Sequence, residues 1–80
     1  PTIMIDTIHR LNRFDIDAFK RGTQYVVIWP GGDIAILDAG ELKDLAVWVR
    51  HEIQWEKKSL QQVQEQFFTT HRNDMIRTIY

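Results

Sequence analysis

The chain has 80 residues, a formal net charge of −1 and no cysteine. Its length predicts one small domain over residues 1–80, and the lack of cysteine excludes disulfide bonds, thiol catalysis and cysteine-based zinc sites. Hydrophobic residues make up 44% and charged residues 26%, which is typical of a globular protein and not of a disordered one.

The distribution of charged and apolar residues narrows the expected partners. No apolar run is long enough to span a membrane and no signal-peptide pattern is present, so we expect a cytoplasmic protein without a membrane partner. No segment is a block of Lys and Arg, so the electrostatic pattern of a nucleic-acid-binding protein is missing.

The N-terminal segment has two interpretations. Its apolar residues share one broad face of a helical wheel: Met4, Ile5, Ile8, Leu11, Phe14, Ala18 and Phe19. This pattern predicts a helix over most of residues 6–21, ended by Gly22 in the left-handed conformation. Asn12 and Asp15 interrupt the apolar face, and the alternative is a strand over residues 2–8 followed by a short helix that Asp15 caps.

Two β-rich runs separated by Gly31-Gly32 predict an antiparallel β-hairpin over about residues 24–37. A two-residue loop at these glycines would pair Trp29 with Ile34, Val27 with Ile36 and Tyr25 with Asp38. Both faces of the hairpin are apolar, so we expect cover on both sides. A third strand would come from residues 2–6 or from another copy of the chain.

The segment after the hairpin has the signals of a helix start. Asp38 and Glu41 have the spacing of a capping box, which predicts a helix over about residues 39–57. The apolar residues of this segment recur at helical spacing: Leu42, Leu45, Ala46, Val49 and Ile53.

Ser59 and Gln62 repeat the capping-box pattern, which predicts a last helix over about residues 60–78 after a sharp turn. Because no Gly or Pro follows Gly40, the rival is one continuous helix of about 38 residues, roughly 57 Å long, which would imply a homodimer. A strand over residues 75–80 is a further alternative for the tail. We predict an α+β fold: an N-terminal helix, a central hairpin and two C-terminal helices packed on it.

No pattern of catalytic residues stands out in the sequence. The three histidines, His9, His51 and His71, lack the spacing of a helical metal site. A nucleophile elbow, a P-loop and a dinucleotide-binding fingerprint are all absent from the sequence. We therefore predict no catalytic residues, no metal site and no cofactor, and a protein that is not an enzyme.

Two tryptophans mark the predicted helix after the hairpin. Trp48 and Trp55 lie seven residues apart and therefore on one side of that helix. Either both indole rings pack into the core, or they form an aromatic patch that binds a partner. The predicted partner-binding set joins them to their neighbours and to the hairpin tip: Trp48, Trp55, His51, Glu52 and Trp29.

The leading functional hypothesis is a small regulatory protein, not an enzyme, that binds another protein or a second copy of itself. Compact regulators of phages and mobile elements are of this kind, an analogy of size and fold alone. The alternative is a helix-turn-helix-like nucleic-acid-binding regulator, whose last helix would read adenine edges with Gln61, Gln62 and Gln64. That helix has no Lys or Arg before Arg72, so nucleic acid is the less favoured partner.

Overall fold

The computed structural model describes the backbone of residues 2–70 and the side chains of residues 4–70. Within this range the elements are α1 (Thr2–Arg13), β1 (Asp17–Arg21), β2 (Gln24–Ile28), β3 (Ile34–Leu37), α2 (Ala39–Arg50), the π-helix η1 (His51–Trp55) and α3 (Leu60–Thr70). The strands form one antiparallel sheet in the order β1-β2-β3. An N-terminal helix, this sheet and the helices that follow confirm the predicted α+β class.

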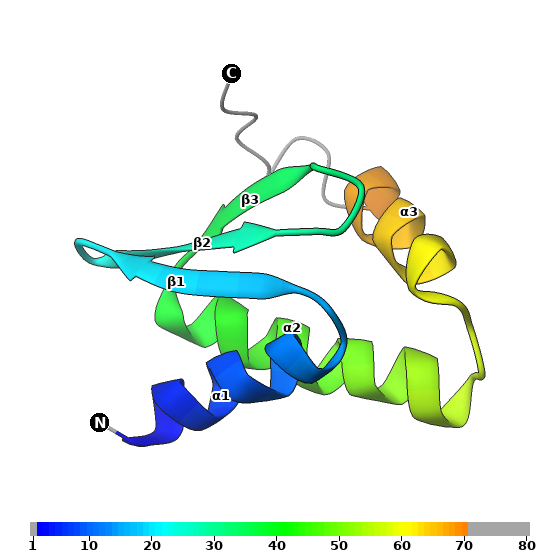
Figure 1. Cartoon of the computed structure of the whole chain (residues 1–80), viewed down its shortest axis with the longest axis horizontal. Helices are drawn as coiled ribbons and strands as arrows, with labels where there is room; N and C mark the ends of the chain where they lie inside the picture. The colour runs from blue at the N-terminus through cyan, green and yellow to red at the C-terminus, as the bar shows by residue number, and fades with distance from the viewer. Residues whose placement is uncertain (1, 71–80) are drawn as a thin grey trace.

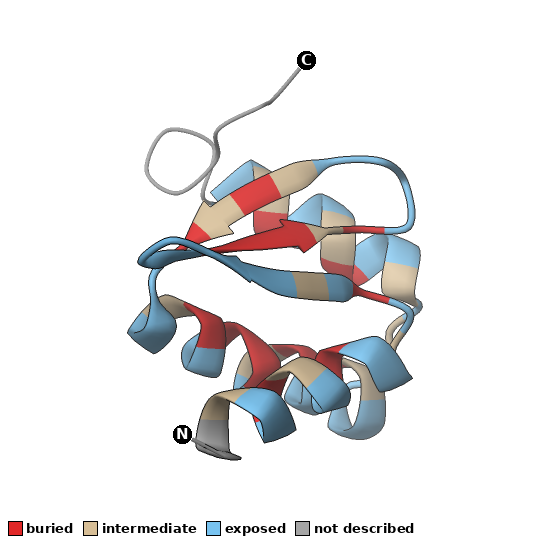
Figure 2. Ribbon diagram, turned by 60° about the vertical axis from the view of Figure 1, so that its left-hand side comes forward, coloured by how far each residue is buried: buried red, intermediate tan, exposed pale blue. Residues whose placement is uncertain are grey.

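The elements are arranged in two layers (Figure 1). The sheet lies over α1 and α2, and α3 lies beside the loop that joins β2 to β3. Buried positions concentrate in β2, in β3 and in α2 (Figure 2). The core consists of Leu11, Ile16, Tyr25, Val27, Trp29, Ala35, Leu37, Leu42, Leu45, Ala46, Val49, Val63 and Phe67. None of the helices described is both long enough and apolar enough to cross a membrane.

Helix α1 ends at Arg13, and the predicted continuation of this helix through the following residues is wrong. The N–H of Asp15 donates to the carbonyl three residues back, that of Asn12 (3.0 Å). The N–H of Ile16 donates to the carbonyl of Leu11 (3.1 Å). These two bonds are the Schellman arrangement, in which Asp15 takes the left-handed conformation (φ 63°) that glycine usually supplies.

The third strand is β1, and neither residues 2–6 nor another copy of the chain provides it. The alternative of a strand over residues 2–8 is also wrong, because these residues belong to α1. Gly22, expected at a helix end, instead makes the turn between β1 and β2 with a φ of 65°. Four of the five residues of β1 are exposed, so no alternation of apolar and polar residues marks this edge strand in the sequence.

The register between β2 and β3 differs by one residue from the expected one. Val27 lies opposite Ala35 and not opposite Ile36, and all three expected pairs are displaced in the same way. The cause is a longer loop, in which the N–H of Gly32 donates to the carbonyl of Trp29 (2.8 Å) and Gly32 has a φ of 93°. A shift by one residue exchanges the two faces of a strand, so Ala35 and not Ile36 is fully buried.

Helix α2 begins at the predicted capping box. The N–H of Glu41 donates to Oδ1 of Asp38 (2.8 Å), and the N–H of Asp38 donates to Oε1 of Glu41 (2.9 Å). The predicted apolar stripe faces the core through Leu42, Leu45, Ala46, Val49 and the partly buried Ile53. The helical segment ends at Trp55 and α3 starts at Leu60, so the continuous-helix alternative is wrong and its argument for a dimer falls with it.

Aromatic side chains hold α3 against the rest of the fold. The ring centroids of Trp29 and Phe67 are 5.2 Å apart, and those of Trp48 and Phe67 are 6.2 Å apart. Phe68 adds edge-on contacts to both Trp29 (5.9 Å) and Phe67 (5.1 Å). The cluster therefore joins the hairpin, α2 and α3 at one place.

The last helix, α3, is buried at Val63 and Phe67. The predicted helix end near residue 78, the alternative strand over residues 75–80 and His71 lie outside the described residues.

Candidate functional site

Three members of the predicted partner-binding set lie in η1: His51, Glu52 and Trp55. This turn is π-helical, since the N–H of Glu56 donates to the carbonyl five residues back, that of His51 (3.1 Å). π-helical turns are rare in proteins, and those that occur are frequently found at functional sites. The two tryptophans differ in burial: Trp48 packs against the core, whereas Trp55 is exposed.

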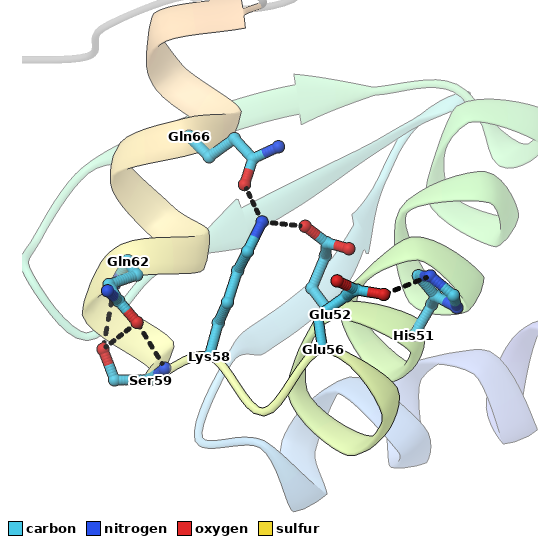
Figure 3. Close-up of polar contacts among 7 residues, drawn as sticks. All are labelled: His51, Glu52, Glu56, Lys58, Ser59, Gln62 and Gln66. Atoms are coloured by element: carbon cyan, nitrogen blue, oxygen red, sulfur yellow. Dashed lines mark hydrogen bonds and ion pairs between the residues drawn. The ribbon is translucent and has the colours of Figure 1, made fainter.

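Lys58 holds η1 and α3 together (Figure 3). Its Nζ lies 2.6 Å from Oε1 of Glu52 and also donates to Oε1 of Gln66 (2.8 Å). The Glu52 side chain is 8% exposed and the Lys58 side chain 33%, so the pair is largely shielded from water. A charge-assisted hydrogen bond is stronger in such surroundings than at the open surface.

Backbone and capping bonds complete the link between η1 and α3. Lys57 takes the left-handed conformation (φ 58°), and the N–H of Lys58 donates to the carbonyl of Glu52 (3.0 Å). Ser59 and Gln62 form the predicted capping box, in which the N–H of Gln62 donates to Oγ of Ser59 (3.2 Å). In return the N–H of Ser59 donates to Oε1 of Gln62 (3.0 Å). The surface around η1 is thus fixed by hydrogen bonds on both sides of the turn.

Two members of the predicted set are buried, and a third is partly buried. Trp29 is 1% exposed and Glu52 is 6% exposed, so neither offers contact area to a partner. Trp48 is half-buried and packs against the core beside Phe67. For Trp48 the core interpretation of the sequence therefore fits its position.

Trp55 and His51 are the members of the set that lie at the surface. Trp55 is 73% exposed, which is unusual for a residue type that is mostly buried in folded proteins. The His51 side chain is also exposed, and its Nε2 lies 3.6 Å from Oε2 of Glu56 (Figure 3). The π-helical turn thus presents one aromatic ring and one imidazole to solvent.

The glutamines expected to read DNA take part in contacts within the molecule. Gln62 caps α3, and Gln64 bridges to the hairpin loop. Its Oε1 accepts from the N–H of Gly31 (3.3 Å), and its Nε2 donates to Oδ2 of Asp33 (2.8 Å). A Cβ atom at position 31 would meet the Gln64 amide, so a larger residue there requires this side chain to move. As described, α3 also lacks Lys and Arg, so these contacts lend no support to the nucleic-acid alternative.

A second constellation lies between α1 and α2, and the sequence did not predict it. One cavity of about 90 Å³ is lined by three arginines, an aromatic ring and an amide: Arg10, Arg13, Arg50, Phe14 and Gln54. Nε of Arg50 donates to Oε1 of Gln54 (3.1 Å). Within residues 4–70 no carboxylate forms an ion pair with any of the three guanidinium groups.

The sequence indicates which cavity residues share a helix face, but not that the two helix faces meet. Arg10 and Arg13 are three residues apart and therefore share one face of a helix. Arg50 and Gln54 are four residues apart and share one face of the next helix for the same reason. That these two faces meet follows from the packing of α1 against α2, which no local pattern indicates.

No three His, Asp or Glu side chains within the described part of the chain gather closely enough to hold a metal ion. No protein-family model, no curated protein and no solved structure matches the chain. The function must therefore be inferred from the chemistry of the η1 surface and of the arginine cavity.

Proposed function

We propose that this protein binds another protein through the surface around Trp55, and that it is not an enzyme. The observation that carries the proposal is the 73% exposure of Trp55 on a turn fixed by the partly buried Glu52–Lys58 pair. Trp is enriched among the residues that contribute most to binding energy, and a surface that is already ordered loses less entropy on binding. The regulatory role and the cytoplasmic location expected from the sequence belong to this proposal.

The surroundings of Trp55 have the make-up of a small interface. The apolar ring stands among polar neighbours in the chain, Gln54, Glu56 and Lys57, and His51 adds a second exposed ring in the same turn. An apolar centre with a polar rim is the usual composition of a protein-binding patch. We define the proposed surface as Trp55, His51 and Gln54.

The test compares Trp55→Ser with Phe19→Ser, which removes another exposed aromatic ring (47% exposed) on β1. Partners are captured with the full chain from its native host, and the captured protein is purified for affinity measurement. We expect Trp55→Ser to weaken binding by roughly 10–30-fold, because a central Trp typically contributes about 2 kcal/mol or more. Phe19→Ser should change the affinity less than about 2-fold, and circular dichroism should show both variants folded.

Two results would contradict the proposal. One is a purified partner that binds Trp55→Ser as tightly as it binds the unchanged chain. The other is a capture experiment in which every protein that the unchanged chain retains is also retained by Trp55→Ser, or in which the unchanged chain retains none. A second copy of the chain is the other expected partner, and sedimentation of the unchanged chain and of Trp55→Ser over a range of concentrations distinguishes it from a different protein.

A further inference from the structure

Three arginines from two helices line one small cavity at the surface, and we propose that this cavity binds a phosphate monoester group. These residues are Arg10, Arg13 and Arg50, and all three are exposed. The site goes beyond protein binding at Trp55: it adjoins that surface at Gln54, but it does not depend on protein binding there.

The charge in the cavity is not neutralised within the described chain. Arginine stays protonated in proteins, so the site carries three positive charges around a space of about 90 Å³. No carboxylate of residues 4–70 forms an ion pair with them. Like charges around one small cavity repel one another, and an anion that binds there reduces that repulsion.

The ends of helices do not account for all three arginines. Arg10 and Arg13 lie in the last turn of α1, where positive charge suits the helix dipole. Arg50 has a different position, because the helical backbone continues through η1 to Trp55. Its Nε donates to Gln54, which orients the guanidinium plane and leaves the two terminal nitrogens for the forked hydrogen bonds that oxyanions accept.

Size and charge select the class of ligand. The cavity is too small for a drug-sized or dinucleotide ligand, since such pockets measure about 300–1,000 Å³. A phosphate monoester carries about −1.5 to −2 charges on three terminal oxygens, which suits a cavity lined by three arginines. A carboxylate carries one charge, and nucleic-acid phosphates are spread along a backbone that is bound by a row of cations. The half-buried Phe14 offers an apolar wall to the carbon chain that bears the phosphate.

The test is a titration of the whole chain followed by the arginine Nε–Hε signals in nuclear magnetic resonance spectra. The probes are a short phosphoserine peptide, glycerol phosphate, a hexaglutamate peptide and an oligothymidine, all at the same low salt concentration. We expect saturable shifts with a Kd below about 1 mM for the two monoesters, and at least about 10-fold weaker binding of the other two probes. Arg50→Gln and the double variant Arg10→Gln/Arg13→Gln should each weaken monoester binding by about 10-fold or more.

The matched control is Arg21→Gln, which removes the same charge from an exposed position on β1 outside the cavity, and it should change the Kd by less than about 2-fold. Thermal melting shows whether each variant is folded, and the double variant decides if Arg50→Gln unfolds. Tighter binding of the phosphopeptide identifies a phosphorylated side chain of a partner as the source, and tighter binding of glycerol phosphate identifies a small phosphorylated compound; both support the site. The proposal is overturned if neither monoester gives a saturable shift, if hexaglutamate or oligothymidine binds as tightly, or if Arg21→Gln weakens binding as much as Arg50→Gln.

Discussion

Lys57 occupies a backbone conformation that costs free energy for any residue with a Cβ atom. Its φ of 58° lies in the left-handed region, where an L-residue is disfavoured by about 1–2 kcal/mol. Lys57→Gly removes this cost but adds about 0.5–1 kcal/mol of chain entropy to the unfolded state. We expect a net gain of roughly 0.5–1 kcal/mol, or a few degrees in Tm, measured by thermal unfolding. Lys57→Ala loses the same charge and keeps the strain, so a similar gain with Ala would contradict this explanation.

Some features of single residues could be predicted from the sequence, and others could not. The capping boxes of Asp38 with Glu41 and of Ser59 with Gln62 were predicted because each partner lies three residues away. The helix stop at Asp15 was not, because a left-handed position is normally signalled by glycine.

At the scale of elements, the ion pair between Glu52 and Lys58 joins η1 to α3. Lys58→Met leaves a carboxylate that is 8% exposed without its cation, and we expect a loss of about 2–3 kcal/mol, below the range for a fully buried pair because Lys58 is partly exposed. Replacing both partners, as Glu52→Leu/Lys58→Met, should restore stability to within about 1 kcal/mol of the unchanged chain. Urea unfolding of the two variants measures the difference. A double variant as unstable as Lys58→Met would show that the lysine acts through packing and not through charge.

The sequence predicted some helices and strands correctly and missed others. α2 was readable because Leu42, Leu45 and Val49 repeat at helical spacing and the capping box marks its start. β1 was not, since an exposed edge strand carries no apolar alternation. The existence of the hairpin followed from its glycines, but its register depended on the length of the loop. Pro30 belongs to the loop together with the two glycines, and this third loop residue shifts the pairing by one.

At the scale of the whole molecule, stability depends on the aromatic cluster that α3 brings to the core. A domain of 80 residues is stable by only about 4–12 kcal/mol. Phe67 is 3% exposed and contacts both Trp29 and Trp48, so Phe67→Ala should cost about 3–5 kcal/mol. Phe19→Ala makes the same chemical change at a side chain that is 47% exposed, and it should cost less than about 1 kcal/mol. Denaturant unfolding compares the two, and equal losses would mean that the cluster does not hold the fold together.

The sequence by itself determined those features whose two partners lie close together along the chain. These are the α+β class, the hairpin, the capped starts of α2 and α3 and the buried stripe of α2, because hydrogen bonding and helical periodicity act within a few residues. The tertiary structure alone decided which side chains are buried and which ones converge. It buried Trp29 and Glu52, left Trp55 exposed in a π-helical turn, and brought Arg50 to the same cavity as Arg10 and Arg13. Burial and clustering depend on which faces pack against each other, and those faces come from segments far apart in the chain.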